Sequence, residues 1–101
     1  MGLAGLALLS TVFAGCVSDA ELKEKASGHI RIGTAHIQAG QYTPALKELL
    51  EAEKLTPNDP TVHYYLGIAY ERKGFIDDAF REFQKAIALK PDYSEANNFL
   101  G

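Results

Sequence analysis

Residues 60–93 read PTVHYYLGIAYERKGFIDDAFREFQKAIALKPDY, and residues 26–59 read ASGHIRIGTAHIQAGQYTPALKELLEAEKLTPND. The two segments align without a gap, and the identical positions, nine of the 34, are His29/His63, Gly33/Gly67, Ala35/Ala69, Gly40/Gly74, Ala45/Ala79, Glu48/Glu82, Ala52/Ala86, Leu55/Leu89 and Pro57/Pro91. Self-similarity at one period of this length is typical of repeat proteins, in which each unit buries its apolar face against its neighbours. The sequence therefore predicts two copies of one structural unit.

Each copy carries the stop signals of two helices. Gly40 and Gly74 stand where a first helix must end, because glycine accepts the left-handed backbone geometry of a helix C-terminus. Pro57 and Pro91 stop the second helix of each copy. The sequence predicts helices over residues 20–39, 43–55, 60–73, 77–89 and 94–101.

Small and apolar residues set the packing of these helices. Gly33 and Gly67 remove a side chain where the two helices of a copy approach closely, and Thr43 and Asp77 stand where we expect N-caps. Apolar residues at three- and four-residue steps predict helix faces turned into the stack, and they are Leu46, Leu49, Leu50, Phe80, Phe83 and Ile87.

The repeat resembles the tetratricopeptide repeat, whose pattern reads W-x2-L-G-x2-Y followed by Ala, an aromatic residue, Ala and Pro. His63 replaces the Trp, and the matching residues of the second copy are Leu66, Gly67, Tyr70, Ala79, Phe83, Ala86 and Pro91. The resemblance implies an all-α fold of helical hairpins stacked as a short right-handed α-solenoid. It assigns residues 26–59 to a first repeat, 60–93 to a second, and 94–101 to the truncated start of a third.

Composition argues against several classes of function. The 101 residues carry 10 Lys and Arg against 13 Asp and Glu, whereas a nucleic-acid binder normally has a basic excess. The single Cys excludes an intramolecular disulfide. No phosphate-binding loop, nucleophile elbow or metalloprotease motif is present, so we expect neither an enzyme nor a cofactor.

The histidines and paired acidic residues favour structural roles. His29 and His63 occupy one repeat position and His36 occupies the Tyr position, so we expect all three to be packing residues rather than metal ligands. Glu51 and Glu53 are expected to be solvated charges of a helix surface without a catalytic role.

The resemblance implies a concave groove lined by the first helix of each hairpin. The groove positions carried over to this chain are Ile30, Thr34, Ile37, Tyr64, Tyr65, Ile68, Glu71, Arg72, Asn98 and Phe99. Their aromatic and aliphatic character suits an extended or helical segment of a partner protein. Tyr64 is expected to be exposed, whereas Tyr65 and Ile68 are as well suited to burial against neighbouring hairpins.

The apolar segment at the N-terminus ends in Val12-Phe13-Ala14-Gly15-Cys16, which resembles the lipobox of bacterial lipoproteins. That resemblance implies a signal peptide over residues 1–15 and a lipid attached to Cys16 that anchors the chain to a membrane. Residues 16–25 are then the tether and the start of the first helix. Val17 after the Cys resembles the signal for the periplasmic face of the outer membrane in the bacterial envelope. The alternative is an unmodified Cys beside a cleaved or cytosolic apolar stretch, which implies a cytoplasmic protein.

The whole chain is similar to outer-membrane lipoproteins of type IV pilus biogenesis, which help the pilus secretin to assemble. The likeness rests on residues 15–17, 30–41 and 97–101. The alternatives are a general envelope adaptor for outer-membrane or cell-wall assembly, and a cytosolic adaptor. In each case we expect a non-enzymatic scaffold that binds protein, and a 101-residue chain that is marginally stable or self-associates.

Overall fold

The computed structural model describes residues 17–100 of the chain, with side chains through residue 98. The helices in this part are α2 (Asp19–Gln38), α3 (Tyr42–Leu55), α4 (Pro60–Arg72), α5 (Ile76–Leu89) and α6 (Ser94–Leu100). These described residues form no strand, and none of their helices combines the length and apolar character needed to cross a bilayer. The predicted all-α fold is confirmed. The predicted signal peptide and Cys16 lie outside the described residues.

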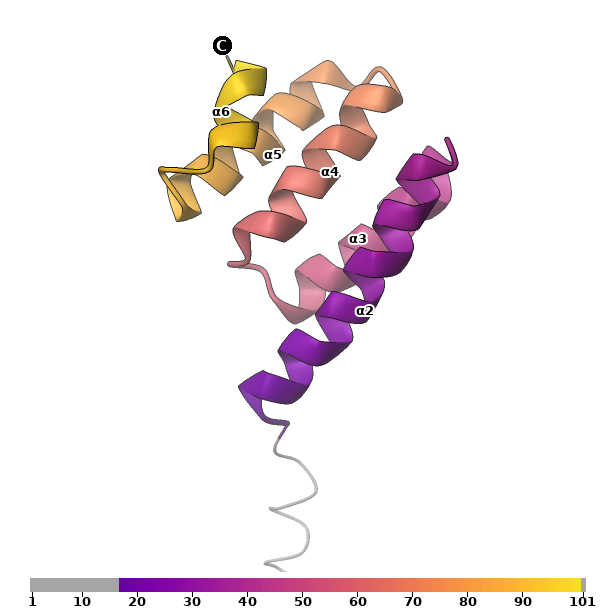
Figure 1. Ribbon diagram of the computed structural model, residues 1–101, viewed down its shortest axis with the longest axis vertical. Helices are drawn as coiled ribbons and strands as arrows, with labels where there is room; N and C mark the ends of the chain where they lie inside the picture. The colour runs from indigo at the N-terminus through magenta and orange to yellow at the C-terminus, as the bar shows by residue number, and fades with distance from the viewer. Residues whose placement is uncertain (1–16, 101) are drawn as a thin grey trace, which may run out of the picture.

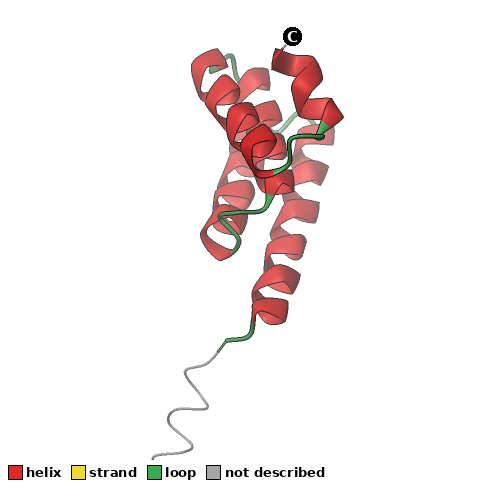
Figure 2. Ribbon diagram, turned by 90° about the vertical axis from the view of Figure 1, so that its left-hand side faces the viewer, coloured by secondary structure: helices red, strands yellow, loops and turns green. Residues whose placement is uncertain are grey.

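The helices stack in chain order. Each of α2 to α5 packs against the next helix, and α2 also touches α4. Figure 1 shows the α2–α3 and α4–α5 hairpins side by side, with α2, α4 and α6 in front of α3 and α5. First helices thus form one layer and second helices the other, which is the arrangement of a helical solenoid. The 20-residue α2 projects at its N-terminal end beyond the rest of the bundle (Figure 2).

Two first helices begin at side-chain caps. The Ser18 hydroxyl accepts the Glu21 N–H at 3.2 Å, and the Glu21 carboxylate accepts the Ser18 N–H at 3.1 Å, which is a capping box. Asp59 caps α4 by accepting the Thr61 N–H at 2.9 Å, with Pro60 in the first turn. Each cap satisfies a backbone N–H group in the first turn of its helix, which has no partner within the helix. Both helices, α2 and α4, belong to the front layer.

The turn inside each hairpin is built on a left-handed glycine. Gly40 has φ 74° and Gly74 has φ 84°, as predicted. After Gly74, the Phe75 N–H donates to the Tyr70 carbonyl at 2.9 Å, which closes the last turn of α4. Gln41 closes α2 in the same way. The two repeats therefore share one turn geometry.

The same turn residues also open the second helices. The Phe75 carbonyl accepts the Ala79 N–H at 3.0 Å, so Phe75 is the N-cap of α5, and Gln41 is the N-cap of α3. The predicted N-caps Thr43 and Asp77 are wrong, because both lie inside the first turn. In each turn one residue donates its N–H to the preceding helix and accepts with its carbonyl from the next one, so it takes the N-cap position itself.

Glycine permits the close approach inside each hairpin. A Cβ atom on Gly33 would lie 2.8 Å from Cγ of Leu49, and one on Gly67 would lie 2.6 Å from Cε1 of Phe83. Real Cβ atoms do not approach other atoms so closely, so the predicted role of both glycines is confirmed.

Two clusters of buried residues form the core. The first joins the hairpins and contains Ala26, Leu46, Leu49, Ala52, Val62, Leu66 and Ala69. The second joins α5 to α6 and contains Ala79, Phe83, Ala86 and Ala96. The first cluster shows that the two hairpins share one buried surface.

The prediction for two apolar residues of the second helices is wrong. Leu50 is 37% exposed and Phe80 is 48% exposed, whereas Leu46, at the repeat position of Phe80, is only 8% exposed. Leu46 lies in the first core cluster with residues of α4, and this contact buries it.

Candidate functional site

The predicted groove residues lie on the front layer formed by α2, α4 and α6. Ile30, Thr34 and Ile37 of α2 are partly buried, and so are Tyr64, Tyr65, Ile68 and Glu71 of α4. Arg72 and Asn98 are exposed, whereas Phe99 belongs to α6 but its side chain lies outside the described part. The predicted groove residues therefore come from three first helices that lie next to one another in the front layer.

A row of tyrosines runs across this layer. The ring of Tyr64 meets Tyr65 edge-on at 5.1 Å between centroids, stacks on Tyr93 at 5.1 Å, and lies 6.0 Å from the ring of Phe83. Tyr64 is therefore half-buried rather than exposed as predicted. Burial raises the pKa of the Tyr64 and Tyr93 hydroxyls. We call Tyr65, Tyr64 and Tyr93 the aromatic row.

The apolar residues of the front layer are neither fully buried nor fully exposed. Ile30, Ile37 and Tyr65 pack at the edge of the first core cluster, and Tyr64 and Ile68 pack at the edge of the second, yet each keeps part of its surface in water. Apolar side chains that are both supported and partly exposed suit a contact surface.

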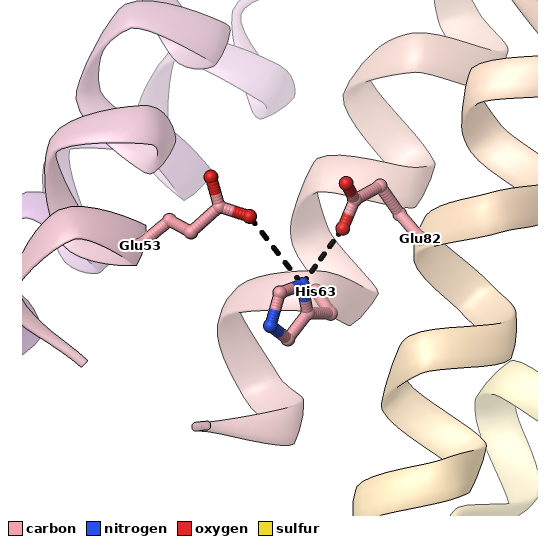
Figure 3. A group of neighbouring side chains, drawn as sticks. All are labelled: Glu53, His63 and Glu82. Atoms are coloured by element: carbon pink, nitrogen blue, oxygen red, sulfur yellow. Dashed lines mark hydrogen bonds and ion pairs between the residues drawn. The ribbon is translucent and has the colours of Figure 1, made fainter. Parts of the chain in front are cut away.

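A second group of side chains lies where the first hairpin meets the second (Figure 3). Glu53 comes from α3, His63 from α4 and Glu82 from α5. Nδ1 of His63 lies 2.7 Å from Oε2 of Glu82 and 3.7 Å from Oε2 of Glu53. Nε2 of His63 lies 2.6 Å from the Pro57 carbonyl and donates to it. His63 is 4% exposed and Glu82 is 8% exposed.

Both members of the buried pair have shifted pKa values. The hydrogen bond to Glu82 raises the pKa of His63 above 6.5, against the opposing effect of burial, and the Pro57 carbonyl and the charge of Glu53 raise it further. Burial raises the pKa of Glu82, but hydrogen bonds from His63 and Lys85 outweigh it and hold that pKa below 4.5. Both shifts favour the charged forms, so the two side chains form an ion pair.

The first repeat contains a copy of this pair. Nδ1 of His29 lies 2.7 Å from Oε2 of Glu48, with both side chains partly exposed. The prediction treated the histidines as packing residues and Glu53 as a solvated charge, and it missed Glu82. Glu53 is in fact partly buried. The missed signal was in the repeat itself, because both His and Glu are identical in the two copies and 19 residues apart.

Comparison with known proteins gives matches along most of the described chain. A family model described as TPR repeat matches residues 33–74, and one described as Tetratricopeptide repeat matches residues 60–93. Superkiller complex protein 3 of Mus musculus is 36% identical over 63 residues, which is 62% of this chain and 4% of that protein.

Two further relatives resemble longer stretches of the chain. Superkiller protein 3 of Saccharomyces cerevisiae is 28% identical over 96 residues, which is 95% of this chain and 7% of that protein. Tetratricopeptide repeat protein 13 of Homo sapiens is 26% identical over 69 residues, which is 68% of this chain and 8% of that protein. The chain thus spans less than a tenth of the length of each of these relatives.

Proposed function

Since the chain contains tetratricopeptide repeats, we propose that it is a non-enzymatic scaffold that holds a protein segment against the layer of α2, α4 and α6. Tetratricopeptide repeats generally bind protein or peptide partners. The observation that carries the proposal is the aromatic row, which is fixed by ring contacts on one side and partly exposed on the other. Rigid aromatic side chains of this kind anchor many protein interfaces.

The charged residues at the rim limit the kind of partner. Glu71 and Arg72 form an ion pair at 3.3 Å between the Arg Nε and a carboxylate oxygen. Because these two charges offset each other, they favour no charged ligand of either sign, and the apolar residues of the face suit an extended or helical segment with apolar side chains.

Site-specific photo-crosslinking tests the proposal. A photoreactive amino acid placed at exposed Arg72 or Asn98 of the front layer is expected to capture a partner of the full-length protein in its host. The matched control is exposed Gln84 on α5, in the other layer, where no capture is expected. Equal capture from both layers, or capture from Gln84 alone, would contradict the proposal.

The proposed location is the periplasmic face of the bacterial outer membrane, with a lipid anchor on Cys16 and a role in assembling the type IV pilus secretin. The lipobox-like sequence 12–16 supports the anchor. The names of the relatives given above mention neither a lipoprotein nor a pilus. The alternatives are a general envelope adaptor and, if residues 1–15 are retained, a cytosolic adaptor.

Mass spectrometry of the protein from its native host tests the anchor. Diacylglyceryl and N-acyl groups on Cys16 are expected, whereas an intact Met1 terminus would refute it. Pull-down of a secretin by the full-length protein then separates pilus assembly from a general adaptor role. Analytical ultracentrifugation of the 101-residue chain tests the proposed self-association.

A further inference from the structure

The cluster of Glu53, His63 and Glu82 has the composition of a metal site. Its three candidate ligand atoms, one ring nitrogen and two carboxylate oxygens, all lie within 4.8 Å of one another. The residues come from three helices and from both repeats, and they converge on one point (Figure 3). Imidazole and carboxylate ligands together suit Zn²⁺ and similar divalent ions.

The orientation of the His63 ring supports this assignment. Nε2 donates its hydrogen to the Pro57 carbonyl at 2.6 Å, which turns Nδ1 toward the two carboxylates. Histidines that bind metals are commonly held in this way, with the second ring nitrogen bonded to a backbone carbonyl. The ring is therefore preorganised by a contact that does not involve the carboxylates.

The distances are close to those that an ion requires. Tetrahedral Zn²⁺ with bonds of about 2.0–2.1 Å places its ligand atoms roughly 3.3 Å apart. The distances from Nδ1 of His63 to the Glu82 and Glu53 oxygens are 2.7 and 3.7 Å, one shorter and one longer. All three ligand atoms lie within 4.8 Å of one another, so binding requires the two glutamate oxygens to adjust their positions around the ion.

Charge and access are also suitable. Lys85 bonds the other oxygen of Glu82, Oε1, at 3.1 Å, so Oε2 remains directed at His63. An open hollow of about 580 Å³ is lined in part by Glu53, Pro57 and His63, so an ion can approach the cluster from the side of Glu53. The two carboxylates supply two negative charges to a divalent ion, and the Lys85 ammonium on Glu82 offsets part of them.

We infer that Glu53, His63 and Glu82 bind one Zn²⁺-class divalent ion, with water completing its coordination, and that the ion ties the first hairpin to the second. On binding, the proton shared between Nδ1 and Glu82 leaves to solvent and the ion takes its place. The ion fixes the angle between the two repeats, and therefore the curvature of the α2–α4 layer.

The first repeat supplies an internal control. His29 and Glu48 reproduce the pair at the same 2.7 Å, but among the described residues only the Glu53–His63–Glu82 group has three such ligands in reach of one another. The chain is therefore expected to bind one ion, at the junction, rather than one ion per repeat.

Titration of the tag-free chain tests the site. After EDTA treatment, calorimetric titration with ZnCl₂ at pH 7.5 is expected to show one saturable site, and Co²⁺ to give the visible absorption of a bound ion. Glu53→Gln, at a partly exposed side chain, is expected to weaken Zn²⁺ binding at least about tenfold, while the control Glu48→Gln leaves it unchanged.

Three results would overturn the inference. They are the absence of saturable Zn²⁺ binding, binding that Glu53→Gln and His63→Gln leave unaffected, and binding that Glu48→Gln weakens as much as Glu53→Gln. Circular dichroism of each variant must show the helix content of the parent chain. These results do not depend on the peptide-binding face, because the cluster shares no residue with the aromatic row.

Discussion

Replacement of Gly67 by alanine tests the close packing of α4 on α5. The new Cβ would lie 2.6, 2.7 and 2.8 Å from three carbons of the Phe83 ring, whereas carbon atoms pack comfortably at about 3.5–4.0 Å. The ring must therefore retreat by about 1 Å. Phe83 is only 2% exposed and is enclosed by the second core cluster, so the ring has little room to move.

The expected cost follows from two opposing effects. Overpacking a closely packed core costs about 1–3 kcal/mol, and the higher helix propensity of alanine returns about 1 kcal/mol. We expect Gly67→Ala to lower the free energy of unfolding by up to about 2 kcal/mol. For a domain of this size each kcal/mol lowers the melting temperature by roughly 4–8 °C.

Gly28→Ala is the matched control. Gly28 also lies in a first helix, but the nearest atom to its added Cβ would be the Arg31 guanidinium at 4.0 Å. This variant is expected to be about 0.5–1 kcal/mol more stable than the parent chain. Urea and thermal unfolding followed by circular dichroism measure both changes on one scale.

A rescue variant makes the test specific to the ring. Combining Gly67→Ala with Phe83→Leu replaces the rigid ring by a smaller side chain, so the double variant should lose less than the sum of the two single losses. If Gly67→Ala is as stable as Gly28→Ala, or if the two losses simply add, then the contact with Phe83 is not the reason for glycine at this position.

Three further predictions concern the turn, the aromatic row and the ion pair. Gly74→Ala places a side chain at φ 84°, although its Cβ would touch nothing within 4 Å. The free energy of unfolding in urea is expected to fall by about 1–2 kcal/mol, and an unchanged value would contradict this. Tyr64→Ala removes three ring contacts and should lower the free energy of unfolding by about 2–3 kcal/mol in the same assay. The control Tyr64→Phe keeps the ring and should lose less than half as much. In EDTA, the contribution of His63 should be complete below pH 6.5 and lost as pH rises through its raised pKa, while that of Glu82 should be complete above pH 4.5 and lost as pH falls. Urea midpoints across pH 4–9 should therefore peak between about pH 5 and 6.5, and His63→Gln should remove the alkaline decline; an unchanged decline would refute the assignment.

Much of the fold was predictable because the same glycine, alanine and proline residues occur at matching positions of both repeats. The helix bounds, the left-handed Gly40 and Gly74, and the close contacts of Gly33 and Gly67 follow from residue type and spacing. The N-cap prediction failed because the backbone of Phe75 bonds both to the last turn of α4 and to the first turn of α5, and helix propensities do not describe such a double role.

The junction cluster was harder to predict. The pairing of His63 with Glu82 depends on the register of α4 against α5, and the approach of Glu53 depends on the angle between hairpins. Neither quantity follows from residue types along one helix. The burial of Leu46 likewise depends on its contact with the second hairpin rather than on the pattern within α3.

The shared turn residue also limits how the length of the chain can change during evolution. An inserted residue rotates the following helix by about 100° and advances it by about 1.5 Å. After Gln41 or Phe75, one insertion would turn the buried alanine face of α3 or α5 away from its partner. Single-residue insertions and deletions in this turn should therefore be eliminated. Length is expected to change by whole units of 34 residues, through duplication or loss of complete hairpins.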